Sequence, residues 1–147
     1  MSEKLKVYLM RADSLGQLYQ GYIVKVENSV GFKQGHKKNR IEVCSLKDDI
    51  VVLGEAKAVI MGRTLNRAVY DEEGNFVTIL AGNLIAVRYR ENTFLSIQEE
   101  DILVIEKMLK PIERIFGGNI YLKDTQKLKI REQKEKILTI DKSRWIL

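Results

Sequence analysis

The chain has 147 residues, of which 45% are hydrophobic, and a formal net charge of +5 at pH 7. One proline and ten glycines leave no linker-like stretch, so residues 1–147 are expected to form a single domain. The first apolar run is too short for a secretory leader or a membrane span, and one cysteine excludes an intramolecular disulfide, so we expect a cytoplasmic protein without membrane contact.

The N-terminal region has the pattern of two strands joined by a short helix. Residues 4–10 and 22–28 alternate apolar with charged side chains, which predicts half-buried strands. Between them, Asp13 or Ser14 can cap one or two helical turns, and Gly21 can end them in the left-handed conformation.

Further strand patterns follow. A hairpin turn is expected at Asp48 and Asp49, and a tight reversal is expected at the acidic run before Gly74 and Asn75. Together the strands predict an antiparallel meander in a β-rich core of residues 4–95. Its further strands are expected over residues 40–46, 49–56, 57–62, 76–82 and 83–90.

From Ser96 the apolar spacing becomes helical. Ser96 and Glu99 are spaced as a capping box, acidic residues follow in the first turns, and the pattern predicts a helix over 97–116 that Pro111 kinks or ends. Residues 119–147 fit a charged amphipathic helix from Thr125 or a hairpin near Gln133, and their composition favours the helix. The expected fold is therefore α+β: an antiparallel β-sheet meander with a short N-terminal helix and one or two C-terminal helices within residues 96–147.

The residue inventory argues against most enzyme chemistry. His36 is the only histidine and Cys44 the only thiol, so no paired metal ligands of the usual spacing exist. No Gly-x-Ser-x-Gly nucleophile motif is present, and the acidic pairs are explained by a turn and a helix start. We therefore predict a binding protein rather than an enzyme, with no catalytic residue, no metal and no cofactor, and with Cys44 as a packing residue.

Basic and aromatic side chains make the candidate ligand site. Arg88 and Arg90 share a strand face by their spacing and precede Asn92 and Phe94, so with the arginines near Asn66 they can form an anion site with an aromatic platform. A solvent-facing basic sheet face is the alternative. The candidate ligand-binding set is Arg63, Asn66, Arg67, Arg88, Arg90, Asn92, Phe94, Lys37 and Lys38.

Two members of this set have alternative interpretations. Arg67 either latches its loop to an acid such as Asp71 or Glu72, or faces an anionic ligand. The basic loop of residues 32–40 contains Lys37 and Lys38, and it either closes over phosphates or a nucleic-acid backbone, with Phe32 available for stacking, or is a solvated insertion.

Two stretches carry a resemblance. The runs LGQLYQGYIVKV, residues 15–26, and LNRAVYDEEGNFVTILAGNLIAV, residues 65–87, resemble a small domain of unknown function encoded by bacteriophages and conjugative elements of low-GC Gram-positive bacteria. That pattern joins a leucine-rich helix, an Asn-Arg pair, an acidic glycine turn and an apolar strand ending in Ala-Gly. Thr78 stands where the pattern has an acid, and residues 28–40 form an inserted loop. The resemblance implies a mobile-element gene in a bacterial host, and no particular chemistry.

These observations favour a phage or mobile-element accessory protein with an anti-defence role, which captures an anionic small molecule such as a nucleotide signal in the host cytoplasm. The alternatives are a protein inhibitor that occludes a host defence enzyme, and a weak nucleic-acid-binding protein. The chain also ends on apolar residues, which predicts a homo-oligomer, specifically a homodimer in which this segment takes part. These residues are Ile137, Leu138, Ile140, Trp145, Ile146 and Leu147.

Overall fold

The structure is a computed structural model that describes residues 4–29, 41–116, 118–123, 138–141 and 145–146. It contains one α-helix and twelve β-strands within these residues. In chain order they are β1 Lys4–Met10, β2 Tyr22–Ser29, β3 Ile41–Ser45, β4 Ile50–Glu55, β5 Leu65–Tyr70, β6 Phe76–Ala81, β7 Leu84–Arg90, β8 Thr93–Leu95, α1 Glu99–Met108, β9 Leu109–Phe116, β10 Asn119–Leu122, β11 Leu138–Asp141 and β12 Trp145–Ile146.

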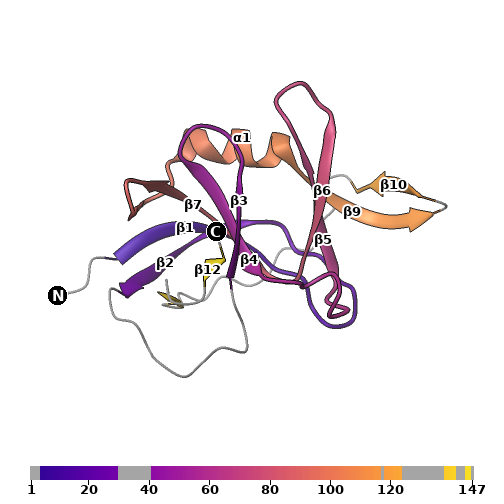
Figure 1. The fold of residues 1–147 in the computed structure, drawn as a ribbon, viewed down its shortest axis with the longest axis horizontal. Helices are drawn as coiled ribbons and strands as arrows, with labels where there is room; N and C mark the ends of the chain where they lie inside the picture. The colour runs from indigo at the N-terminus through magenta and orange to yellow at the C-terminus, as the bar shows by residue number, and fades with distance from the viewer. Residues whose placement is uncertain (1–3, 30–40, 117, 124–137, 142–144, 147) are drawn as a thin grey trace.

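The larger sheet has the strand order β11-β2-β1-β7-β4-β3-β12, with β8 paired to β7 (Figure 1). Neighbours from β2 to β3 are antiparallel, whereas β11 and β12 run parallel to the strands they join. Seven strands laid flat would hold β11 and β12 about 29 Å apart. Residues 142–144 alone connect them and can span at most about 14 Å, so the sheet curls strongly.

Both faces of this curled sheet are buried in its middle. One face gathers Val7 of β1, Val51 of β4 and Val87 of β7 into a core with the strands around them. The other face contributes Tyr8, Val52 and neighbouring residues to a second core shared with α1 and the smaller sheet. Alternating side chains of β1 and β4 therefore point into two different apolar cores at the centre of the sheet, instead of into one core and solvent.

The smaller sheet has the order β10-β9-β5-β6 and is antiparallel throughout. Val69 of β5, Leu109 of β9 and Ile105 of α1 belong to the second core, which holds this sheet and the helix against the larger sheet. The β9–β10 hairpin projects away from the larger sheet (Figure 1). No helix in the described parts of the chain is long and apolar enough to cross a membrane.

The α+β expectation is wrong, because the protein is mostly antiparallel β-sheet and α1 is the only helix among the described residues. The expected N-terminal helix is instead a turn, in which the Asp13 carboxylate accepts hydrogen bonds from the backbone N–H groups of Leu15 and Gln17. Gly16, with φ +87°, takes the left-handed conformation expected of Gly21. Gly21 is required for another reason: a Cβ there would lie 2.2 Å from the Tyr8 ring.

The C-terminal helices are also corrected. The helix begins at Glu99, two residues after the expected start at residue 97. Its first turn is closed by Gln98, whose N–H donates to Asp101, while Ser96 accepts from the Lys6 N–H. It ends at Met108 because the next residues pair with β5 as strand β9, with Arg67 opposite Pro111.

The structure also differs from the expected elements at the C-terminus and after β4. Residues 119–122, 138–141 and 145–146 are strands, not helix, and Thr125, Gln133 and Ile137 lie outside the described residues. Residues 57–62 form turns rather than a strand. The described C-terminal strands pair with β2 and β3 of the same chain, and the predicted homodimer stays a prediction.

Candidate functional site

The Asn66–Arg67 pair connects the two sheets. The β5–β6 register shifts between Leu65 and Arg67, so Asn66 is the extra residue of a β-bulge and is fully buried. Its Nδ2 donates to the Met10 carbonyl at 3.1 Å and to the Gly82 carbonyl at 2.7 Å. The Asn66 amide thus ties strand β5 both to Gly82, which directly follows β6, and to β1 in the larger sheet.

Arg67 is also internal, with 3% of its surface exposed. Its Nη1 donates to the side-chain and backbone oxygens of Asn66, and its Nη2 donates to the Tyr19 carbonyl at 3.0 Å. These carbonyl acceptors take the place of the expected Asp71 or Glu72, because Asp71 closes its own turn by accepting from the N–H groups of Glu73 and Asn75.

The charge of Arg67 is balanced at a distance. Burial lowers the pKa of Arg67 to about 10, and the nearby Tyr8 and Glu106 oppose that shift. The Tyr8 hydroxyl donates to Glu106 at 2.9 Å, and burial together with this contact raises the pKa of Tyr8. Arg67 therefore stays charged at neutral pH inside the junction between the sheets.

The other three candidate arginines each bind a carboxylate of the same chain. Arg63 binds Glu55 through two bonds, of 2.9 and 3.2 Å. Arg88 binds Asp101 with bonds of 2.7 and 2.6 Å, which lower the pKa of Asp101 although burial opposes this. Arg90 binds Asp49. The structure therefore holds these arginines at separate positions, each with its own partner.

The remaining candidate residues occupy different surroundings. Phe94 is 2% exposed and packs in the core against Tyr89, with ring centroids 5.4 Å apart, so it is a core residue rather than an exposed platform. Asn92 lies in the β7–β8 turn and accepts a hydrogen bond from the Tyr89 hydroxyl. Lys37 and Lys38 lie outside the described residues.

Strand β6 contains none of the basic and aromatic residues of the candidate set. It forms one edge of the smaller sheet and, within the described residues, pairs only with β5. Phe76, Val77 and Thr78 are exposed, and no charged residue occurs from Gly74 to Val87. Proteins usually protect an exposed edge strand with charges or proline, because its unpaired backbone groups can bind another strand. The absence of charged residues from Gly74 to Val87 is the sequence signal that indicates this unprotected edge strand.

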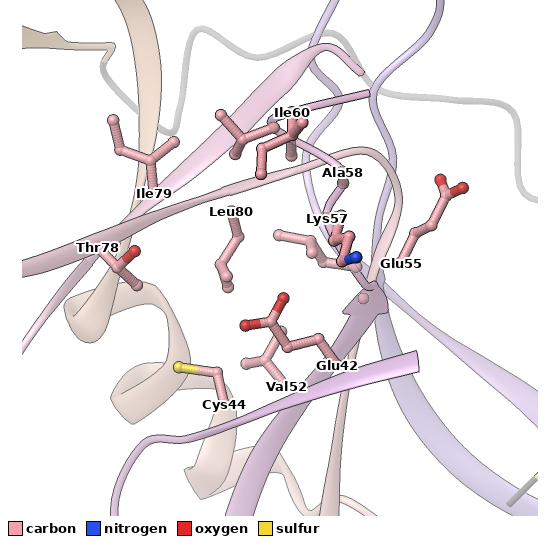
Figure 2. A pocket seen from close by; sticks show the side chains of 14 residues that line it. Glu42, Cys44, Val52, Glu55, Lys57, Ala58, Ile60, Thr78, Ile79 and Leu80 are labelled. Atoms are coloured by element: carbon pink, nitrogen blue, oxygen red, sulfur yellow. The ribbon is translucent and has the colours of Figure 1, made fainter. Parts of the chain in front are cut away.

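A cleft of about 200 Å³, here called the β6 cleft, adjoins this edge. Its walls come from β3, β4, the turn after β4, β6 and the first residue of β7, and Figure 2 shows the side chains that line it. Most of the lining is apolar, including Val52, Ile60 and Leu80, and two separate parts of the sequence build it, residues 42–60 and residues 78–84. The cleft can therefore accept an apolar side chain from a segment lying along β6.

The polar groups of the β6 cleft suit binding better than nucleophilic chemistry. The Glu42 carboxylate points into the cleft, whereas Glu55 is turned away toward its partner Arg63 (Figure 2). Burial, together with Glu42, raises the pKa of the Cys44 thiol, which therefore stays protonated at neutral pH and is a poor nucleophile. The described residues contain no group of three or more His, Cys, Asp or Glu side chains arranged to hold a metal ion.

Comparison with known proteins gives no relative from which a site could be transferred. The chain matches no protein-family model, no curated protein and no solved structure.

Proposed function

We propose that this protein acts by non-catalytic binding of another protein, an extended segment of which adds to β6 and places one side chain in the β6 cleft. The observation that supports this is the position of the apolar cleft directly beside an exposed, charge-free edge strand. In strand addition, backbone hydrogen bonds supply affinity and a side-chain pocket supplies specificity.

The size of the β6 cleft fits this mode of binding. Its volume of about 200 Å³ corresponds to roughly seven waters at about 30 Å³ each. One large apolar side chain can fill that space. Burying a side chain of the size of Leu or Phe contributes about 1.5–3 kcal/mol, enough to distinguish segments that carry an apolar residue at this position from those that do not.

This proposal favours occlusion of a partner protein over capture of a small anion. The resemblance to a phage and conjugative-element domain makes a host defence protein the partner class we favour. Nucleotide capture by Arg63, Arg88 and Arg90 would first require release of Glu55, Asp101 and Asp49. A thermal shift of the protein with any mono- or cyclic nucleotide, lost on changing these arginines, would restore the anionic-ligand hypothesis.

A displayed library of random peptides tests the proposal. Peptides selected on the parent protein are expected to share one large apolar residue and to lose binding when Thr78→Lys places a charge on the β6 edge. Leu103→Lys on α1 is the control, because the Leu103 side chain is 73% exposed, so it can be replaced by a charged one, and Leu103 does not line the β6 cleft. Equal peptide binding by Thr78→Lys and the parent would contradict strand addition.

The single cysteine provides a second measurement. Cys44 lines the β6 cleft, so a bound peptide is expected to slow its reaction with a thiol reagent. Attachment of a bulky maleimide to Cys44 should in turn block peptide binding, while attachment to a Cys44→Ala, Leu103→Cys variant should not. A selected peptide that leaves the Cys44 reaction rate unchanged would show that the side chain enters elsewhere.

A further inference from the structure

The β9–β10 hairpin presents a second surface, which the proposed protein-binding site does not use. Its register places Tyr121 opposite Arg114 and Asn119 opposite Phe116. Residues directly opposite each other, and residues two apart on one strand, point to the same face of a sheet. Arg114, Phe116, Asn119 and Tyr121 therefore share one face of the hairpin, here called the arm face.

The arm face is aromatic and exposed. Phe116 is 68% exposed and Tyr121 is 47% exposed, on a hairpin that projects from the rest of the protein (Figure 1). In the register they are diagonal neighbours, a relation that separates side chains by roughly 7–8 Å. Two flat rings thus lie side by side at a spacing that lets each one contact a separate flat group.

Arg114 adds a positive charge to these rings. Its guanidinium carbon lies 5.9 Å from the centre of the Tyr121 ring. Unlike Arg63, Arg88 and Arg90, it forms no salt bridge with any residue that the structure describes. The neighbouring acid, Glu113, is the extra residue of a β-bulge, because Tyr121 pairs with Arg114 and Leu122 with Ile112, and it forms no salt bridge with Arg114. The donors of Arg114 can therefore bind an external anion.

We propose that the arm face binds single-stranded nucleic acid, with bases stacked on Phe116 and Tyr121 and a phosphate bound by Arg114. Stacking on aromatic rings needs unpaired bases and tolerates any base, because every base has a flat face. A phosphate satisfies the guanidinium donors, and the net charge of +5 attracts the polyanion. A wholly apolar protein partner would leave the charge of Arg114 unmatched, which is why the face fits nucleic acid better.

The test is fluorescence anisotropy with labelled dT20, rU20 and a duplex at 50 and 200 mM salt. The parent is expected to bind both single strands and to prefer them to the duplex. Phe116→Ala and Tyr121→Ala should each weaken binding by about 5- to 150-fold. Arg114→Gln should reduce the slope of log K against log salt by about 0.7, as the loss of one phosphate contact does.

Two variants serve as controls. Ile115→Ala removes an apolar side chain from the same hairpin but from its other face, so binding should be unchanged. Thr78→Lys, which blocks the β6 edge, should not reduce oligonucleotide binding, so this proposal and the protein-binding proposal can fail separately. Three results would each overturn the assignment: no oligonucleotide binding at 50 mM salt, preference for the duplex, or aromatic variants that bind like the parent. A selected peptide whose binding requires Phe116 would instead assign the arm face to a protein partner.

Discussion

Replacing Arg67 by methionine tests whether the Asn66–Arg67 pair holds the two sheets together. Methionine is close to arginine in length, so the change removes the charge and the donors with little loss of packing volume. Three oxygen atoms, two on Asn66 and one on Tyr19, then lose a charged donor inside the protein. The expected result is a large fall in the free energy of unfolding without any loss of an external binding site.

The magnitude follows from two opposing terms. Hydrogen bonds to a charged group contribute about 1.5–3 kcal/mol each, so three of them contribute on the order of 4–9 kcal/mol. Burial works against them: a pKa lowered to about 10 corresponds to a cost of about 3 kcal/mol for keeping Arg67 charged. The replacement removes both terms, which leaves an expected destabilisation of about 3 kcal/mol, within a range of roughly 1–6 kcal/mol.

Urea unfolding at pH 7, followed by circular dichroism, measures the effect. Arg63→Met is the matched control, because Arg63 forms an exposed pair with Glu55 and its loss should cost less than about 1 kcal/mol. A destabilisation of Arg67→Met no larger than that of Arg63→Met would refute the reasoning. Normal stability combined with a lost thermal shift by a nucleotide would show that Arg67 contacts a ligand.

Two further changes probe the folded core. Asp101→Asn weakens the contact with Arg88 and is expected to cost about 2–4 kcal/mol at pH 7, less than a fully buried pair because Arg88 is partly exposed. Folding lowers the pKa of Asp101, so the stabilisation by its carboxylate is present above the ordinary aspartate pKa and is lost as pH falls through the folded-state value. The free energies of unfolding of parent and variant, measured with urea, should therefore converge near pH 2. A constant difference between them would exclude the carboxylate charge as the cause. Gly21→Ala places a Cβ 2.2 Å from the Tyr8 ring and should lower stability by about 1–3 kcal/mol in thermal melting, whereas an unchanged melting temperature would mean that the Tyr8 ring moves freely.

Local features of the fold could be predicted from the sequence because a few neighbouring residues determine them. Strands β1 and β2 are visible as alternation, and the β3–β4 turn is visible in Asp48, which adopts φ 52°. The start of α1 is visible in its three acidic residues, and the β5–β6 reversal in Gly74, with φ +85°. Each signal lies within a span of about eight residues and depends on backbone geometry that those residues set themselves.

Pairing between distant segments decided the rest. The apolar spacing of Leu109 and Ile112 fits a helix or a strand, and β9 forms because β5, some forty residues earlier, supplies a hydrogen-bonding edge. The same holds for the candidate site: Arg67 looked available for a ligand, but the Asn66 bulge turns it toward the Tyr19 carbonyl, 48 residues away in sequence. The cleft beside β6 exists only where residues 42–60 meet residues 78–84, so no local pattern could locate it, whereas the charge-free run from Gly74 to Val87 marks the edge strand itself.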